Sequence, residues 1–130
     1  MKAKLYVGCS LTHAPKAFRE DVAVFKNSLK TTYDVLEFVG LEAGTPADVY
    51  RHDTECVRSC DLFIALCDFP SIGLGYELGL ATELGKPVIA AAHRDAKVTR
   101  LVLGIQNPNY TFLRYNSFEE IAVEIKRRQP

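Results

Sequence analysis

The stretch Asp68-Phe-Pro-Ser-Ile-Gly-Leu-Gly-Tyr-Glu-Leu-Gly79 holds the densest group of residues able to do chemistry. Gly73 and Gly75 leave the backbone bare there, so a flat or ring-shaped ligand can approach closely. We expect Glu77 in the first turn of a helix that follows a buried strand, where the helix dipole would keep its carboxylate ionised and nucleophilic. The alternative is that Glu77 only satisfies the free amides of the helix start.

Two residues outside this stretch are candidates to act together with Glu77. Asp53 lies on an expected helix, in the run Tyr50-Arg-His-Asp53, and its alternative role is that of a solvated carboxylate. Tyr6 lies close to the C-terminal end of the first expected strand. Its alternative role is that of a core aromatic whose hydroxyl has a single hydrogen-bond partner.

The glycine spacing argues against a nucleotide cofactor. Gly73, Gly75 and Gly79 give G-x-G-x-x-x-G in place of the dinucleotide fingerprint G-x-G-x-x-G, and they follow the third expected strand instead of the first. A Walker loop is excluded because the stretch lacks Gly-Lys-Ser/Thr. Cys56 and Cys60 share a helix face, but Cys-x3-Cys without a second pair of ligands is a weak metal motif. We therefore expect neither a metal nor an organic cofactor.

The elements that must position these residues follow from the hydrophobic pattern. Apolar runs alternate with stretches of helical period, which predicts parallel strands joined by helical crossovers. The expected strands span 4–8, 34–39, 62–67, 88–92 and 111–115, and the expected helices follow Pro15, span 47–59, 73–84 and 96–104, and follow Ser117. The prediction is an α/β fold: one domain over residues 1–130, with a doubly wound, Rossmann-like or flavodoxin-like sheet of about five parallel strands.

Ligands of such sheets bind outside the C-terminal ends of the strands. Three segments of this chain end there, at 8–13, 68–77 and 92–97, and all three hold polar or glycine-rich residues. We expect them to converge on one site, with Gly8 and Ser10 among the substrate-binding residues together with those of the glycine-rich stretch.

The composition excludes several functional classes. Sixteen Lys and Arg balance sixteen Asp and Glu, so no basic excess points to a polymeric nucleic acid. No apolar run reaches the roughly 18 residues of a membrane span, and the N-terminus lacks a signal-peptide layout. Most of the four cysteines fall in apolar, core-like settings, which is typical of a reduced protein. We therefore expect a cytoplasmic protein with a small-molecule ligand.

Taken together, these residues resemble the nucleoside 2-deoxyribosyltransferase family. The resemblance spans nearly the whole chain, from Leu5-Tyr-Val-Gly-Cys-Ser10 to the last expected helix. Its most specific part is Pro70-Ser-Ile-Gly-Leu-Gly-Tyr-Glu-Leu-Gly79, which is most similar to the branch of 2'-deoxynucleoside 5'-monophosphate N-hydrolases.

The resemblance implies a role for each candidate. Glu77 matches the family nucleophile, which attacks the anomeric carbon and forms a deoxyribosyl-enzyme ester. Asp53 matches the acid that helps to protonate the leaving base. Tyr6 matches a tyrosine that hydrogen-bonds near the nucleophile and the sugar, and Ser71 matches a serine that contacts the 5'-phosphate in the hydrolase branch. By analogy with retaining glycosidases, the two carboxyl groups are expected about 5–5.5 Å apart.

The chain also departs from the hydrolase branch. Thr12 stands where that branch has an arginine in the first loop, and Lys16, Arg19 and Arg100 are candidates to replace it. Arg100 falls where the family sends a residue into the neighbouring subunit's site. That position implies an intersubunit active site, and hence a homodimer or a larger homo-oligomer.

Three functions remain open at this point. The first is hydrolysis of a deoxynucleoside 5'-monophosphate to free base and deoxyribose 5-phosphate, which Ser71 favours. The second is base exchange between unphosphorylated deoxynucleosides, which the missing loop arginine favours. The third is a non-catalytic nucleotide-binding module on the same fold, in which Glu77 would be dispensable for anything but binding.

Overall fold

The computed structural model describes residues 2–39 and 44–128. Its strands are β1 (Lys4–Cys9), β2 (Asp34–Leu36), β3 (Leu62–Leu66), β4 (Val88–His93) and β5 (Tyr110–Tyr115). Its helices are α1 (Lys16–Leu29), α2 (Pro46–Ser59), α3 (Ile72–Glu83), α4 (Arg100–Leu103) and α5 (Phe118–Arg128).

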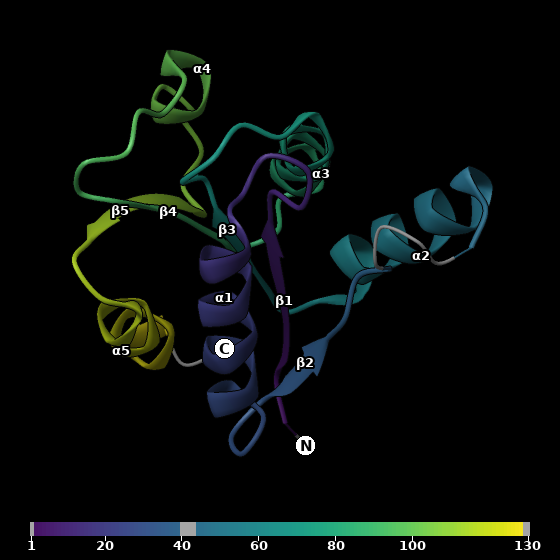
Figure 1. Ribbon diagram of the computed structural model, residues 1–130. Helices are drawn as coiled ribbons and strands as arrows, with labels where there is room; N and C mark the ends of the chain where they lie inside the picture. The colour runs from purple at the N-terminus through teal and green to yellow at the C-terminus, as the bar shows by residue number, and fades with distance from the viewer. Residues whose placement is uncertain (1, 40–43, 129–130) are drawn as a thin grey trace.

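The strands form a parallel sheet in the order β2-β1-β3-β4-β5, and the chain reverses direction across the sheet between β1 and β3 (Figure 1). Every residue of β3 is buried, as the continuously apolar run Leu62–Leu66 predicts for a central strand covered on both faces. The sequence-based prediction of an α/β fold with five parallel strands is confirmed.

Helices cover the sheet on both faces. One face packs under α1 and α5, with Leu5, Val7 and Ile64 of the sheet against Phe25 and Ile121 of the helices. The other face packs under α2 and α3, where Tyr6 and Phe63 are among the buried residues. Because successive residues of a strand point to opposite faces, Tyr6 is directed toward α2 and α3 while its neighbours Leu5 and Val7 are directed toward α1.

Local sequence fixes the start of α2 and the end of α3. Thr45, directly before Pro46, and Asp48 form a capping box at the start of α2, which satisfies free amides that a helix start leaves. Gly85 follows α3 with a φ of 71°, the left-handed conformation that glycine adopts without steric cost. The predicted stop at Gly85 is therefore confirmed.

Strand β2 is shorter than the predicted span 34–39. Beyond Leu36 the backbone bonds to side chains of α2 instead of to a neighbouring strand: the Glu37 carbonyl lies 2.6 Å from the His52 Nε2, and the Val39 amide donates to Asp53 Oδ1 at 3.0 Å. The chain thus leaves the sheet edge early, and this departure brings it to Asp53.

Helix α4 is also shorter than the predicted span 96–104, because the carbonyls before it are bound elsewhere. Arg114 Nη1 donates to the carbonyl oxygens of His93 at 3.0 Å and Ala96 at 2.7 Å, which holds the preceding segment as a turn. Thr99 then caps the single helical turn that remains. Among the residues that the structure describes, no helix is long and apolar enough to cross a membrane.

Candidate active site

The loops at the C-terminal ends of β1, β3 and β4 are held together by hydrogen bonds. Ser10 Oγ donates to the Pro70 carbonyl at 2.9 Å, which joins the loop after β1 to the loop after β3. The His93 amide donates to Asp68 Oδ2 at 2.8 Å, which joins the end of β4 to the same loop. The predicted convergence of the three segments is confirmed.

The centre of the candidate site is a hydrogen bond between Tyr6 and Glu77. Tyr6 is fully buried and stacks on Phe63, with ring centroids 5.5 Å apart, so its ring is held in place by the sheet. Its hydroxyl donates to Glu77 Oε2 at 2.5 Å, across 71 residues of sequence. Tyr6 is therefore neither a free surface group nor only a core aromatic, since its polar end is bound to the candidate nucleophile.

Glu77 does not lie in the first turn of α3, and that prediction is wrong. The helix begins at Ile72, its first turn holds no acidic residue, and Glu77 is in the second turn. Burial raises the pKa of Glu77 to about 7, the hydrogen bond from Tyr6 lowers it, and the charge of Asp53 raises it. The hydrogen bond from Tyr6, not the helix start, is therefore what favours the charged form of this carboxyl.

Asp53 lies on α2, beside α3 on the same face of the sheet (Figure 1). The Val39 amide donates to its Oδ1 at 3.0 Å, which fixes the carboxylate at the point where the chain leaves β2. Its charge contributes to the raised pKa of Glu77 and, after burial and Glu77 itself, to the raised pKa of Tyr6. Glu77, Tyr6 and Asp53 thus lie close enough for their charges and hydrogen bonds to shift the pKa values of Glu77 and Tyr6. Their expected carboxyl separation of about 5–5.5 Å stays a prediction.

The glycines of the site differ in what they make room for. A side chain at Gly8 would meet Leu74 Cδ1 at 3.0 Å and Phe63 Cε1 at 3.2 Å, so Gly8 lets α3 pack closely on the end of β1. Nothing lies within 4 Å of a Cβ at Gly75, and only Ser71 Oγ, at 3.9 Å, would approach one at Gly73. The backbone at the start of α3 is therefore open to a ligand, as expected from the sequence.

The two serines have structural bonds of their own. Ser10 is buried, and besides donating to Pro70 its hydroxyl accepts from the His13 amide at 3.2 Å. Ser71 caps α3, because its hydroxyl accepts from the Leu74 amide at 3.0 Å. That bond leaves the Ser71 hydroxyl hydrogen free to donate to a ligand, whereas Ser10 already uses its hydrogen within the loops. Substrate contact by either residue stays a prediction.

Arg100 comes from a different part of the molecule. It opens α4, is exposed, and is followed by Leu101, which is 81% exposed. In Figure 1, α4 stands at the upper corner opposite α2, so Arg100 and Asp53 come from elements that are far apart within one chain. Of the other cations considered for the phosphate, Lys16 pairs with Glu20 at 3.6 Å on the exposed side of α1.

Two features near the site were missed from the sequence. Asp68 accepts from Tyr115 at 2.6 Å as well as from the His93 amide, and so ties β3 to β4 and β5. Tyr50 and Tyr76, neighbours of Asp53 and Glu77 along their helices, approach within 3.3 Å through their hydroxyls. The position of Asp68 directly after an apolar strand was the available signal for the first, and the spacing of Tyr50 and Asp53 for the second.

The cysteines are poorly suited to bind a metal ion. All four are free thiols, and burial raises the pKa of Cys56 to about 11, so it is a poor thiolate ligand at neutral pH. Its sulfur lies 3.6 Å from His52 Nε2. Over residues 2–39 and 44–128 no three groups of the His, Cys, Asp or Glu type gather as a metal site would require.

Comparison with known proteins gives one family and several relatives. The family model described as nucleoside 2-deoxyribosyltransferase matches residues 6–123. A protein of Syntrophotalea carbinolica with the provisional name 2'-deoxynucleoside 5'-phosphate N-hydrolase 1 is 36% identical over 80 residues, which are 62% of this chain and 56% of that protein. A protein of Thermofilum pendens with the same provisional name is 31% identical over 100 residues, or 75% of this chain and 68% of that protein.

The solved structures agree with the fold. A CMP N-glycosidase of Clostridium botulinum superposes with a TM-score of 0.67 at 23% identity, over 95% of this chain and 98% of that chain. At this identity the similarity shows a shared fold. The match of the first curated relative covers little more than half of that protein's length.

Proposed function

Because the chain belongs to the nucleoside 2-deoxyribosyltransferase family, we propose that it hydrolyses the N-glycosidic bond of 2'-deoxynucleoside 5'-monophosphates, with water as the final acceptor. The products are a free base and 2-deoxyribose 5-phosphate, and no cofactor takes part. The provisional names of the two relatives support a phosphorylated substrate. The single observation that carries the chemistry is the bond from Tyr6 to the buried carboxyl of Glu77, within the field of Asp53.

The first step forms an ester on Glu77. An ionised oxygen of Glu77 attacks C1' of the sugar, and the C1'–N bond breaks with its electron pair leaving on the base. Asp53, in its protonated form, gives a proton to the departing nitrogen. Tyr6 holds Oε2 of Glu77 by its hydrogen bond, which leaves Oε1 as the attacking atom and fixes its direction.

The second step releases the sugar. Water attacks C1' of the ester, Asp53 takes a proton from that water, and Glu77 leaves again as a carboxylate. Atoms and charge then balance, because the proton given to the base in the first step is replaced in the second. If a second nucleobase attacks in place of water, the same ester gives base exchange.

The start of α3 suits a 5'-phosphate. Helix N-termini bind anions through free amides and the helix dipole, and here Gly73 and Gly75 carry no side chain that would obstruct the approach. The Ser71 hydroxyl adds a donor at the same place. These features support Ser71, Gly73 and Gly75 as phosphate-side residues.

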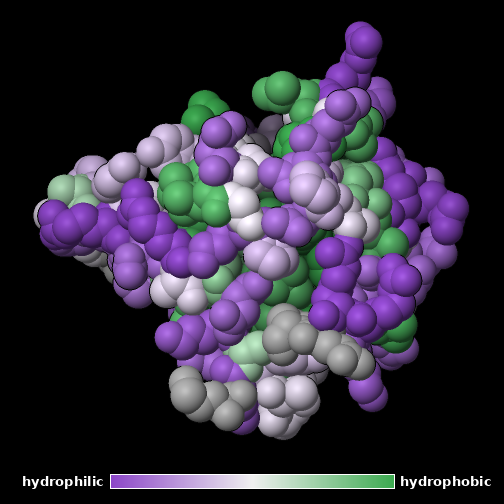
Figure 2. Space-filling model, turned by 180° about the vertical axis from the view of Figure 1, so that it is seen from behind, coloured by the Kyte–Doolittle hydropathy of each residue, from purple (hydrophilic) through white to green (hydrophobic). Residues whose placement is uncertain are grey.

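A second subunit completes the site in this proposal. Arg100 would supply the cation that Thr12 cannot, from the α4 of a neighbouring copy. Exposed apolar side chains on α3 and α4 support such an assembly, because Ile72 at the start of α3 is 96% exposed and Leu101 and Leu103 of α4 are 81% and 43% exposed. Figure 2 shows hydrophobic atoms reaching the surface at the upper end of the molecule, where α3 and α4 lie.

Deoxynucleoside base exchange is the second candidate. The observation that favours it is Thr12, an exposed residue where the hydrolase branch has its loop arginine. Without that arginine, the phosphate would lose a charge-assisted bond of about 1.5–3 kcal/mol, and unphosphorylated nucleosides would compete better.

One chromatographic assay separates the alternatives. A deoxynucleoside and its 5'-monophosphate are each incubated with the protein, with and without a second free base. We expect release of free base from the monophosphate, with no dependence on the second base. A new nucleoside that forms only with the second base would replace hydrolysis by exchange, and no product under any condition would contradict catalysis altogether.

The nucleophile is tested with Glu77→Gln and Glu77→Ala. Both variants are expected to stay folded and to lose base release by at least about 1,000-fold, because no carboxylate is left to form the ester. Acid quenching of the wild-type reaction, followed by mass spectrometry of peptides, should show deoxyribose 5-phosphate attached to Glu77. Retained turnover in both variants would remove Glu77 from the mechanism.

A further inference from the structure

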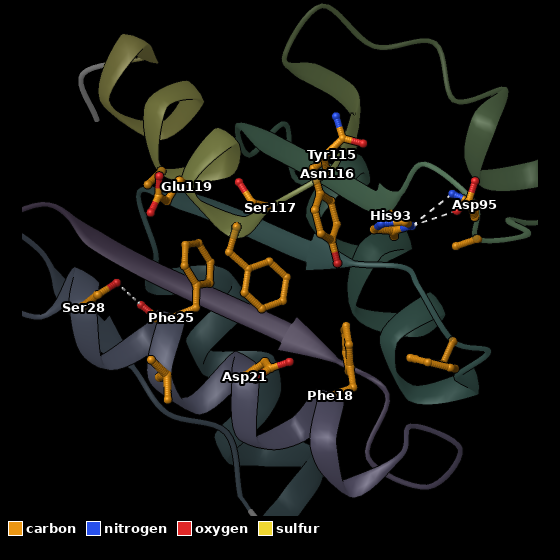
Figure 3. A pocket seen from close by; sticks show the side chains of 15 residues that line it. Phe18, Asp21, Phe25, Ser28, His93, Asp95, Tyr115, Asn116, Ser117 and Glu119 are labelled. Carbon is orange, nitrogen blue, oxygen red and sulfur yellow. Dashed lines mark hydrogen bonds and ion pairs between the residues drawn. The ribbon is translucent and has the colours of Figure 1, made fainter.

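A cavity lies on the sheet face opposite Glu77. Its volume is about 830 Å³, and it is bounded by α1, α5 and the loop that follows β4. Figure 3 shows Phe18, Asp21 and Phe25 entering it from α1, Ser117 from the bend before α5, Glu119 from α5, and Tyr115 reaching into the space between them. A volume of this size suits a ligand of several hundred daltons or less. The chemistry of Glu77 makes no use of this cavity.

The walls of the cavity are aromatic. Phe18 meets Phe69 edge to face with ring centroids 5.0 Å apart, and Phe118 lies 5.0 Å from Phe25 and 5.2 Å from Tyr115. These five rings come from α1, the loop after β3, the end of β5 and α5. All five rings line the cavity, whose volume leaves room for a flat ring or a quaternary ammonium group.

The charge around these rings is negative. Asp21, Asp95 and Glu119 line the cavity and are exposed, and no lysine or arginine is among its lining residues within the described part of the chain. The Tyr115 hydroxyl donates a hydrogen bond to Asp68 Oδ2. The other carboxylate oxygen, Asp68 Oδ1, is buried without a hydrogen-bond partner among the described residues. Burial, the hydrogen bond to Asp68 and the charges of Asp68 and Asp21 all raise the pKa of Tyr115.

We propose that this cavity is a binding site for a small organic cation with an aromatic or apolar body. A cation near the face of an aromatic ring gains about 0.5–2 kcal/mol, and three carboxylates at the rim favour the same sign of charge. An anionic ligand, including a nucleotide, would be repelled. The site is therefore distinct in ligand chemistry from the phosphate-binding end of α3.

The test uses three probes that share a benzyl group. Benzyltrimethylammonium is the cation, benzyl alcohol the neutral control and phenylacetate the anionic control, each titrated into the protein and followed by ligand-observed NMR. We expect benzyltrimethylammonium to bind at least about tenfold more tightly than benzyl alcohol, and phenylacetate to bind most weakly. Equal affinity of the cation and benzyl alcohol would overturn the proposal.

Matched double variants locate the binding. Asp21→Asn with Glu119→Gln removes two rim charges without changing side-chain size, and is expected to weaken benzyltrimethylammonium about tenfold while leaving benzyl alcohol unchanged. The control pair is Glu20→Gln with Glu83→Gln, two exposed carboxylates outside the cavity lining, and it should keep wild-type affinity. Equal losses in both pairs would mean a general charge effect and would contradict a built site.

The competing occupant is a second copy of the chain. Val24 lines the cavity and is 70% exposed, so Val24→Arg would disrupt any subunit interface on this face. We expect Val24→Arg to weaken benzyltrimethylammonium while the mass measured by sedimentation stays that of the wild type. A fall in mass would show that the face is a subunit interface and would overturn the proposal. None of these measurements involves turnover, so their outcome is independent of the proposed hydrolysis.

Discussion

The Tyr6 hydroxyl and the Asp53 carboxylate act on Glu77 in opposite directions. The hydrogen bond from Tyr6 favours the ionised carboxylate, while the charge of Asp53 and burial favour the neutral acid, and the resulting pKa of Glu77 is about 7. A nucleophile in this balance gains or loses its charge with small changes in pH or in its neighbours. Rate and stability therefore both depend on pH near neutrality.

Tyr6→Phe tests the first half of this balance. Removing the hydrogen bond raises the pKa of Glu77 above about 7, so less of the protein carries the reactive carboxylate at neutral pH. We expect the acid limb of the kcat/KM profile for a deoxynucleoside monophosphate to move to higher pH, with a loss of about threefold to thirtyfold at neutrality. An unmoved limb, even with a lower plateau, would show that Tyr6 does not set the charge of Glu77.

Glu77→Gln tests the cost of keeping this carboxyl buried. The folded-state pKa of Glu77, about 7, lies above its ordinary value of 4.5, so the stability that the neutral acid gives is present at low pH and is lost as pH rises through about 7. Glutamine cannot ionise, and the variant should be more stable than the wild type by roughly 2 kcal/mol above neutrality and similar to it below the ordinary carboxyl range. Urea unfolding at several pH values measures the difference. A constant difference at all pH values would contradict the raised pKa.

The identities of the site residues could be read from the sequence, but their energetics could not. Glu77, Asp53 and Tyr6 were selected from motif and spacing, and the structure brings them together. The predicted cause of the charge on Glu77 was wrong, because the helix start and the depth of burial depend on packing between α2, α3 and the sheet. Asp68 was missed for a similar reason, since its partner Tyr115 is 47 residues away.

At the scale of elements, Ser71 at the start of α3 has two roles: it caps the helix, and in the proposed function it contacts the substrate phosphate. Ser71 caps the helix through the Leu74 amide, and the proposed function also gives it the 5'-phosphate. Ser71→Ala therefore affects both, with a loss of about 1 kcal/mol in stability from the cap alone. It cannot by itself separate capping from phosphate binding.

Ser71→Asp makes that separation. Aspartate caps helices as well as serine does, so thermal unfolding should stay close to that of the wild type. Its negative charge would repel a phosphate, and we expect KM to rise at least about tenfold for the monophosphate and to change little for the nucleoside. Equal changes in KM for both substrates would mean that the phosphate lies elsewhere.

The element boundaries were predictable where one hydrophobic pattern decides them. The buried run of β3 and the stop at Gly85 are examples. Strand β2 ends early and helix α4 begins late because the adjoining backbone bonds to side chains from distant segments, Asp53 on α2 and Arg114 on β5. Hydrogen bonds from distant side chains leave no pattern in the local sequence. A prediction from hydrophobic periodicity therefore makes both elements too long.

At the scale of the whole molecule, the sheet separates two regions with different chemistry. The α2–α3 face holds the carboxyl pair and Tyr6, and the α1–α5 face holds the aromatic cavity (Figures 1 and 3). The loop from Asp68 to Ser71 is common to both, since Phe69 lines the cavity and Ser71 caps α3. The aromatic cavity was not predictable from sequence, because its rings come from four separate segments.

The assembly prediction rests on Arg100, because its helix α4 lies far from α2, the helix of Asp53, within one chain (Figure 1). If Arg100 reaches a neighbour's phosphate site, Arg100→Ala and Glu77→Gln damage the same site through different subunits. A mixed dimer of the two variants then holds one site with Glu77 from one subunit and Arg100 from the other, both intact. After subunit exchange of an equal mixture, about a quarter of wild-type activity at low monophosphate concentration is expected from random pairing.

The controls for this experiment use the same proteins. Each variant alone should be weak on the monophosphate, and Arg100→Ala should remain active on the unphosphorylated nucleoside, since only the phosphate contact is lost. Mixing Glu77→Gln with Asp53→Asn is the matched control, because both changes lie in the part of the site that one chain builds, and no pairing can restore it. Activity of the Arg100 mixture equal to the mean of its components would place each active site within a single subunit.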